Sequence, residues 1–117
     1  MNPGGVSVGN EQRDKERFRQ ADEAATMRRA QLLHFDYLDT RNYTLPNGPV
    51  QDVITVSDMY KDYFTLLSSE GNRYGFAITN RTPQSITKDL QTRFPDKLVS
   101  IKMISESGWR ELMRIYD

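Results

Sequence analysis

The segment over residues 71–116 constrains the fold most, because it contains a complete order of secondary-structure signals. Residues 73–79 (RYGFAIT) place Tyr74, Phe76 and Ile78 on one face of a strand. Thr82 and Pro83 then supply a hydroxyl at the N-cap and a proline at the first position of a helix. A strand over residues 98–104 and a helix after a capping serine follow. This order predicts a small α/β domain.

The preceding residues add a hairpin and a short strand. Residues 63–67 (YFTLL) form a strand, and the sequence EGN at residues 70–72 supplies the positive φ angles of a tight turn. Residues 35–38 alternate as a short strand, residues 39–49 form a loop, and Ser57 caps a short helix. We therefore expect an α/β (α+β) fold with a mixed sheet of about four strands and two to three packed helices, preceded by an N-terminal helix.

The chain divides into three parts on composition. Residues 1–10 are small and polar, which predicts a disordered tail. Residues 11–33 lack proline and glycine and predict a helix, and residues 34–117 form the α/β domain. The first half of the helix has one apolar residue, Phe18, which indicates a solvated extension or a partner-docking surface. In the second half we expect a buried face formed by Ala21, Ala24, Ala25, Met27, Ala30, Leu32 and Leu33.

Bulk properties exclude several classes of protein. The sequence has no cysteine, so disulfides and thiolate chemistry are excluded. Sixteen basic and sixteen acidic residues balance, so we expect no nucleic-acid partner. No apolar run reaches the ~20 residues of a membrane span, and the first residues lack the pattern of a secretory signal. We expect a cytoplasmic protein without direct membrane insertion.

The sequence lacks a recognisable catalytic motif. Neither G-x-x-x-x-G-K-[ST] nor G-x-G-x-x-G occurs. His34 is the single histidine, and its expected role is packing or a favourable charge at a helix C-terminus, with a ligand or general base as the alternative. We interpret Asp36 and Asp39 as turn and cap residues, and an acid–base pair is the less favoured alternative. We expect no enzyme activity, catalytic residue, cofactor or metal.

Binding candidates are found among the arginines and aromatic residues. Arg28, Arg29, Arg41 and Arg81 would bind phosphate if they converged, although scattered solvated arginines are the simpler interpretation. Exposed tyrosines are common at protein interfaces. The residues we expect to contact a protein partner are Phe18, Arg28, Arg29 and Tyr43.

The order of short motifs is similar to a known family. The motifs are LLHFDYLD at residues 32–39, YFTLLS at residues 63–68 and EGNRYGFAITNRTP at residues 70–83. A helix containing Ile86, a strand over residues 99–104 and a closing helix that ends at a tyrosine follow in order. From about residue 25 to residue 117, the chain resembles the N-terminal domain of the type II secretion and type IV pilus assembly ATPases.

The resemblance implies a regulatory docking module. Such domains bind the cytoplasmic part of an inner-membrane platform protein and couple it to the ATP-binding motor of the full-length protein. The motor's phosphate-binding motif is absent from this sequence, so we expect an excised domain or a stand-alone relative. Some members bind cyclic di-GMP through a Leu-Gly motif, which residues 13–27 lack. Sensing of cyclic di-GMP or another nucleotide is the alternative function, and a small enzyme using His34 and Asp36 is a third.

Overall fold

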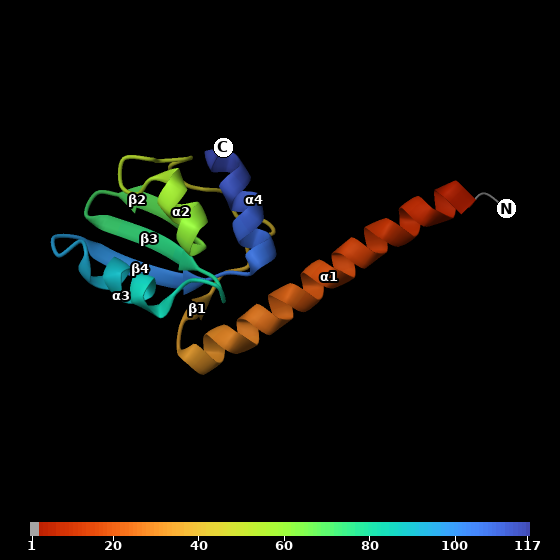
Figure 1. The fold of residues 1–117 in the computed structure, drawn as a ribbon, viewed down its shortest axis with the longest axis horizontal. Helices are drawn as coiled ribbons and strands as arrows, with labels where there is room; N and C mark the ends of the chain where they lie inside the picture. Colours follow the sequence, from red (N-terminus) through yellow and green to blue (C-terminus); the bar gives the residue numbers. More distant parts are fainter. Residues whose placement is uncertain (1–2) are drawn as a thin grey trace.

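The computed structural model describes the backbone of residues 3–117 and the side chains of residues 11–117. Four strands form one sheet in the order β1-β4-β3-β2, in which β2 and β3 are antiparallel and the other neighbours are parallel (Figure 1). The expected α/β fold with a mixed sheet, a hairpin and a leading helix is therefore confirmed. The elements in chain order are α1 (Pro3–Leu33), β1 (Asp36–Tyr37), α2 (Val56–Asp62), β2 (Phe64–Glu70), β3 (Arg73–Ile78), α3 (Gln84–Thr92), β4 (Leu98–Met103) and α4 (Glu106–Tyr116).

The hairpin between β2 and β3 forms where the sequence predicts it. Glu70 pairs with Arg73, so the turn contains Gly71 and Asn72. Gly71 has a φ of 57°, a conformation that glycine adopts without steric cost. β3 then pairs with β4 in parallel, with Phe76 opposite Ile101 and Ile78 opposite Met103.

Helix α4 covers the sheet with the apolar stripe that its sequence predicts. Trp109, Leu112, Met113 and Tyr116 are all buried. Trp109 Nε1 donates a hydrogen bond to the carbonyl of Phe64 at 2.9 Å, and the Tyr116 hydroxyl donates to the carbonyl of Leu66 at 2.5 Å. These two bonds satisfy the polar ends of the buried aromatic rings. The predicted cap of this helix is confirmed by a bond from the Gly108 amide to Ser105 Oγ.

The predicted caps of the other two short helices are wrong. Helix α3 begins at Gln84 with Pro83 at the N-cap and without a side-chain cap. Thr82 instead closes a turn: its hydroxyl accepts from the Thr79 amide at 2.9 Å and donates to the Tyr63 carbonyl at 2.6 Å. Tyr63 ends α2 in a left-handed conformation, which makes its carbonyl available to this hydroxyl. The cap of α2 is Thr55, not Ser57.

Helix α1 extends well beyond the domain (Figure 1). Its 31 residues correspond to about 46 Å of helix, and the molecule measures 64 × 31 × 22 Å. The helix begins at Pro3, within the tail expected to be disordered, while residues 1 and 2 lie outside the described residues. The division into a tail, a helix and a domain at residues 11 and 34 stays a prediction.

The end of α1 is a Schellman motif centred on His34. His34 has a φ of 63°, its amide bonds the Gln31 carbonyl, and the Phe35 amide bonds the Ala30 carbonyl at 2.9 Å. Glycine is the usual residue at this position because its left-handed conformation costs other residues energy. His34 therefore turns the chain from α1 into β1.

Candidate functional site

The side of α1 that packs on the domain is polar. Glu23 is only 3% exposed. Its carboxylate accepts hydrogen bonds from Arg19 Nε at 2.7 Å, from the Tyr37 hydroxyl at 2.6 Å and from the Ser105 hydroxyl at 2.5 Å. A buried carboxylate needs such partners, because an unpaired charge in the interior is very costly. This network ties the helix to β1 and to the start of α4.

Neighbouring contacts extend the network along the N-terminus of α4. Asp22 accepts a bond from the Ser107 hydroxyl at 2.6 Å, and Arg19 bonds Glu111 at 2.5 Å. A carboxylate near a helix N-terminus interacts favourably with the helix dipole. Burial and then the Glu23 carboxylate raise the pKa of the Tyr37 hydroxyl well above its usual value. The phenol is thus held in the protonated form, as a hydrogen-bond donor.

The apolar face expected in the second half of α1 is mostly not buried. Ala30 is buried, whereas Met27, Leu32 and Leu33 are exposed. Ala21 is also exposed, and Ala24 and Ala25 are half-buried. The prediction is wrong because the adjoining surface of the domain offers Tyr37 and Ser105 as polar partners, which place Glu23 on the buried side of the helix. Thr26 is buried beside it and bonds the Asp22 carbonyl of its own helix.

A second side of α1, here called the outer face, consists of Phe18, Ala21, Ala25, Arg28 and Leu32. These residues recur at alternating intervals of three and four, the spacing of a coiled-coil seam. Phe18 is 71% exposed and Leu32 is 79% exposed. Large apolar side chains that remain exposed at this spacing are typical of a helix that packs on another helix. Two of the predicted interaction residues, Phe18 and Arg28, lie on this face.

The four arginines considered for phosphate binding do not form one site. Arg41 pairs with its neighbour Asp39, with Nη2 and Oδ2 2.5 Å apart. Arg81 lies over the Tyr63 ring at 4.5 Å from the centroid and pairs with Glu106 at 3.3 Å. Arg28 is exposed on the outer face, and among these four only Arg29 lines the cavity described below. A nucleotide held by all four is therefore not supported by their positions.

The remaining predicted residues have local roles. Tyr43 is half-buried against the core, and burial, followed by the charge of Glu70, raises the pKa of its hydroxyl. It is thus only partly available to a partner. His34 and Asp36 are exposed beside the α1–β1 turn. Among residues 11–117, no cluster of three or more histidine, aspartate or glutamate side chains could hold a metal ion.

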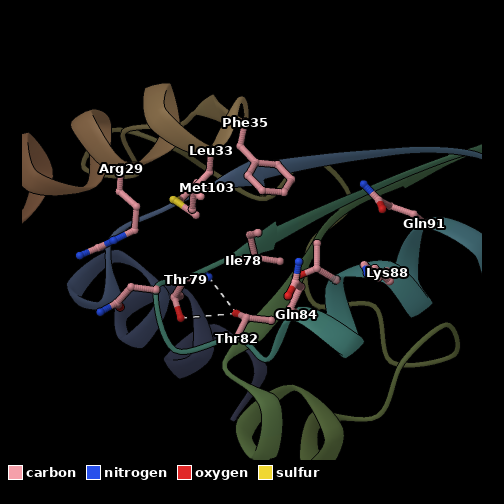
Figure 2. Close-up of a pocket in the computed structure, with 12 residues that line it drawn as sticks. Arg29, Leu33, Phe35, Ile78, Thr79, Thr82, Gln84, Lys88, Gln91 and Met103 are labelled. Carbon is pink, nitrogen blue, oxygen red and sulfur yellow. Dashed lines mark hydrogen bonds between the residues drawn. The ribbon is translucent and has the colours of Figure 1, made fainter.

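A cavity of about 480 Å³ opens between the end of α1 and helix α3 (Figure 2). Apolar side chains form one part of its lining: Leu33, Phe35, Ile78 and Met103. The rest of the lining is polar and consists of Arg29, Thr79, Asn80, Thr82, Gln84, Thr87, Lys88 and Gln91.

Helix α3 contributes a polar stripe to this cavity that sequence reasoning missed. Gln84, Thr87, Lys88 and Gln91 are spaced i, i+3, i+4 and i+7, so they share one side of the helix. This spacing is the feature of the sequence that could have revealed the polar stripe. The sequence could not place the stripe opposite Arg29, because the two helices are brought together only by the sheet (Figure 2).

Comparisons with known proteins identify the fold. The crystal structure of the N-terminal domain of XpsE, a type II secretion ATPase, superimposes with a TM-score of 0.59 over 85% of this chain, at 10% sequence identity. The chain covers 66% of that structure's length. No family model and no curated protein matches the sequence. The resemblance predicted from the motifs is therefore confirmed as a shared fold. No helix in the described part of the chain is long and apolar enough to cross a membrane.

Proposed function

We propose that this protein is a non-catalytic docking module of a type II secretion or type IV pilus assembly ATPase. It would couple the motor to the cytoplasmic domain of an inner-membrane platform protein. The fold shared with the XpsE N-terminal domain supports the family, and the exposed outer face of α1 supports a protein partner. The module would act in the cytoplasm and reach the inner membrane through that partner. ATP binding and hydrolysis are assigned to the motor and not to these residues.

The outer face carries this proposal. Phe18 and Leu32 lie 14 positions apart on one side of the helix, about 21 Å along its axis. A partner helix laid along this face would cover both side chains, with Ala21 and Ala25 allowing close approach between them. The apolar area removed from water would supply the main driving force.

The test measures binding of the purified chain to the cytoplasmic domain of the platform protein by biolayer interferometry. Replacing both anchors, Phe18→Glu with Leu32→Glu, should weaken binding at least about tenfold, since buried anchors each contribute more than about 1.4 kcal/mol. The matched control is Ile115→Glu, because Ile115 is also an exposed apolar helical residue but lies on α4. Equal binding by all three proteins would refute the outer face as the docking surface. The absence of any binding would refute the platform as the partner.

A further inference from the structure

The cavity between α1 and α3 supports a role separate from protein docking. We propose that it binds a small organic anion. The apolar or aromatic body of the ligand lies on Phe35, Ile78 and Met103, and its acidic group pairs with Arg29 or Lys88. This inference does not depend on the docking function.

The size and floor of the cavity fit such a ligand. Its volume of about 480 Å³ lies within the roughly 300–1,000 Å³ typical of small-molecule sites. Ile78 and Met103 are buried residues of neighbouring parallel strands, paired in register at the same end of the sheet. Phe35 stands beside them at the end of α1 (Figure 2). These side chains are held by the core, so the floor is already formed.

The charge of the lining favours an anion. Arg29 on α1 and Lys88 on α3 both line the cavity, and Figure 2 shows the Arg29 guanidinium at its rim, turned outward from the apolar floor. No acidic residue lines the cavity, and neither cation forms an ion pair with a side chain of residues 11–117. Unpaired cations in a concave site concentrate the positive potential there.

Backbone and hydroxyl donors at the start of α3 add to this preference. Gln84 is the first residue of α3 and lines the cavity, and the helix has neither a side-chain cap nor an acidic residue in its first turn. Free amides at a helix start attract anions. Thr87, on the next turn of the same helix, also lines the cavity and adds a hydroxyl group to it.

The experiment uses 1-naphthyl phosphate, 1-naphthoate and neutral 1-naphthol as probes, with inorganic phosphate as a further arm. Binding to the full chain is measured by calorimetry and by shifts of backbone amide resonances. We expect both naphthyl anions to bind with shifts centred on residues 78–91, and naphthol and inorganic phosphate to bind at least about tenfold more weakly. A preference between the two naphthyl anions distinguishes a phosphate ligand from a carboxylate ligand.

Variants separate the cavity from general surface charge. Arg29→Gln with Lys88→Gln should weaken anion binding about tenfold or more, since a charge-assisted hydrogen bond contributes more than a neutral one. Thr87→Val should weaken it to a smaller extent. Arg28→Gln is the matched control, because Arg28 is the adjacent helical arginine and does not line the cavity. The proposal is overturned if no naphthyl anion binds saturably, if naphthol binds as tightly as the anions, or if Arg28→Gln has the same effect as the double substitution.

Discussion

Helices α1 and α4 are attached to the same domain by different interactions. Helix α4 buries a continuous apolar stripe that includes Trp109 and Met113. Helix α1 buries Glu23, Thr26 and the small residue Ala30, and its large apolar side chains Phe18 and Leu32 remain exposed. Apolar burial is strong and non-directional, whereas a buried polar contact depends on every partner being in place. The comparison indicates that α4 is part of the domain's core, whereas α1 is a helix bound to the domain's surface by specific polar contacts.

The difference also separates two sides of α1. The docked side is polar and fully bonded, so it fixes the position of the helix with specificity. On the outer face, Phe18 and Leu32 remain exposed on either side of Ala21, Ala25 and Arg28, so this face is available for a partner. A helix that used its apolar side to join the domain would have no comparable surface left for docking.

The largest expected effect is a loss of folding stability when the apolar contact between α4 and the sheet is disrupted. Trp109→Ala removes a buried ring and leaves the Phe64 carbonyl without its indole donor. We expect a loss of about 3–5 kcal/mol in the free energy of unfolding, measured by urea titration. The control Ile115→Ala, on the exposed side of the same helix, should cost less than about 0.5 kcal/mol. A similar cost for both substitutions would contradict the role assigned to the stripe.

A smaller loss of stability is expected when the polar contact between α1 and the domain is disrupted. Glu23→Ala leaves Arg19, Tyr37 and Ser105 without their shared acceptor, at a cost of about 2 kcal/mol. Hydrogen exchange should then show faster exchange of the α1 amides after residue 18, while α4 keeps its protection. Glu16→Ala, a change at an exposed position in the projecting half of α1, should alter neither readout. Loss of protection in α1 and α4 together would show that the two attachments are one cooperative unit.

The smallest expected effect is a decrease in stability at alkaline pH, caused by deprotonation of a tyrosine in the contact between α1 and the domain. The folded state raises the pKa of Tyr37 above its ordinary value of 10.0, mainly by burial and then by Glu23. A raised pKa means that the folded protein holds this proton more tightly than the unfolded chain. The contribution to stability is therefore complete below pH 10 and is lost as the pH rises above it.

Urea titrations from neutral to strongly alkaline pH measure this loss. Tyr37→Phe should lower stability near neutral pH, because Glu23 loses a donor, and should make the alkaline decline shallower. Tyr74→Phe is the control, since Tyr74 packs against Phe76 and Phe94 in the sheet domain and its hydroxyl forms no hydrogen bond with the side chain of Glu23. An unchanged alkaline slope in Tyr37→Phe would exclude the phenol at the α1 interface as a source of the pH dependence.

Much of the sheet domain was predictable, because its signals are local. Gly71 in the turn, Ser105 as a cap and the stripe from Trp109 to Tyr116 each depend on residues within one or two helical turns. The cap assigned to Thr82 was wrong because its hydroxyl has a distant competitor, the Tyr63 carbonyl. The predicted buried side of α1 was wrong because it also depends on a distant part of the chain. Apolar periodicity predicts burial only where the partner surface is apolar.

The candidate sites were less predictable than the fold. Phe18 and Arg28 could be proposed from their residue types, and the outer face places them on one side of the helix. Arg41 and Arg81 were poorer candidates than their charge indicated, because each has a carboxylate partner that the sequence did not assign. The cavity was missed, because its residues come from α1, β3, α3 and β4.

The sequence alone determined the order of strands and helices, the hairpin, the apolar face of α4 and the family that the fold resembles. These features follow from short-range periodicity and turn chemistry, which act within each segment. The tertiary structure alone decided which side of α1 is buried, that Glu23 joins α1 to Tyr37 and Ser105, and that Arg29 and Lys88 line the same cavity. Polar contacts between distant segments depend on the assembled surfaces, because a charged side chain can be buried only where its partners are already held in place.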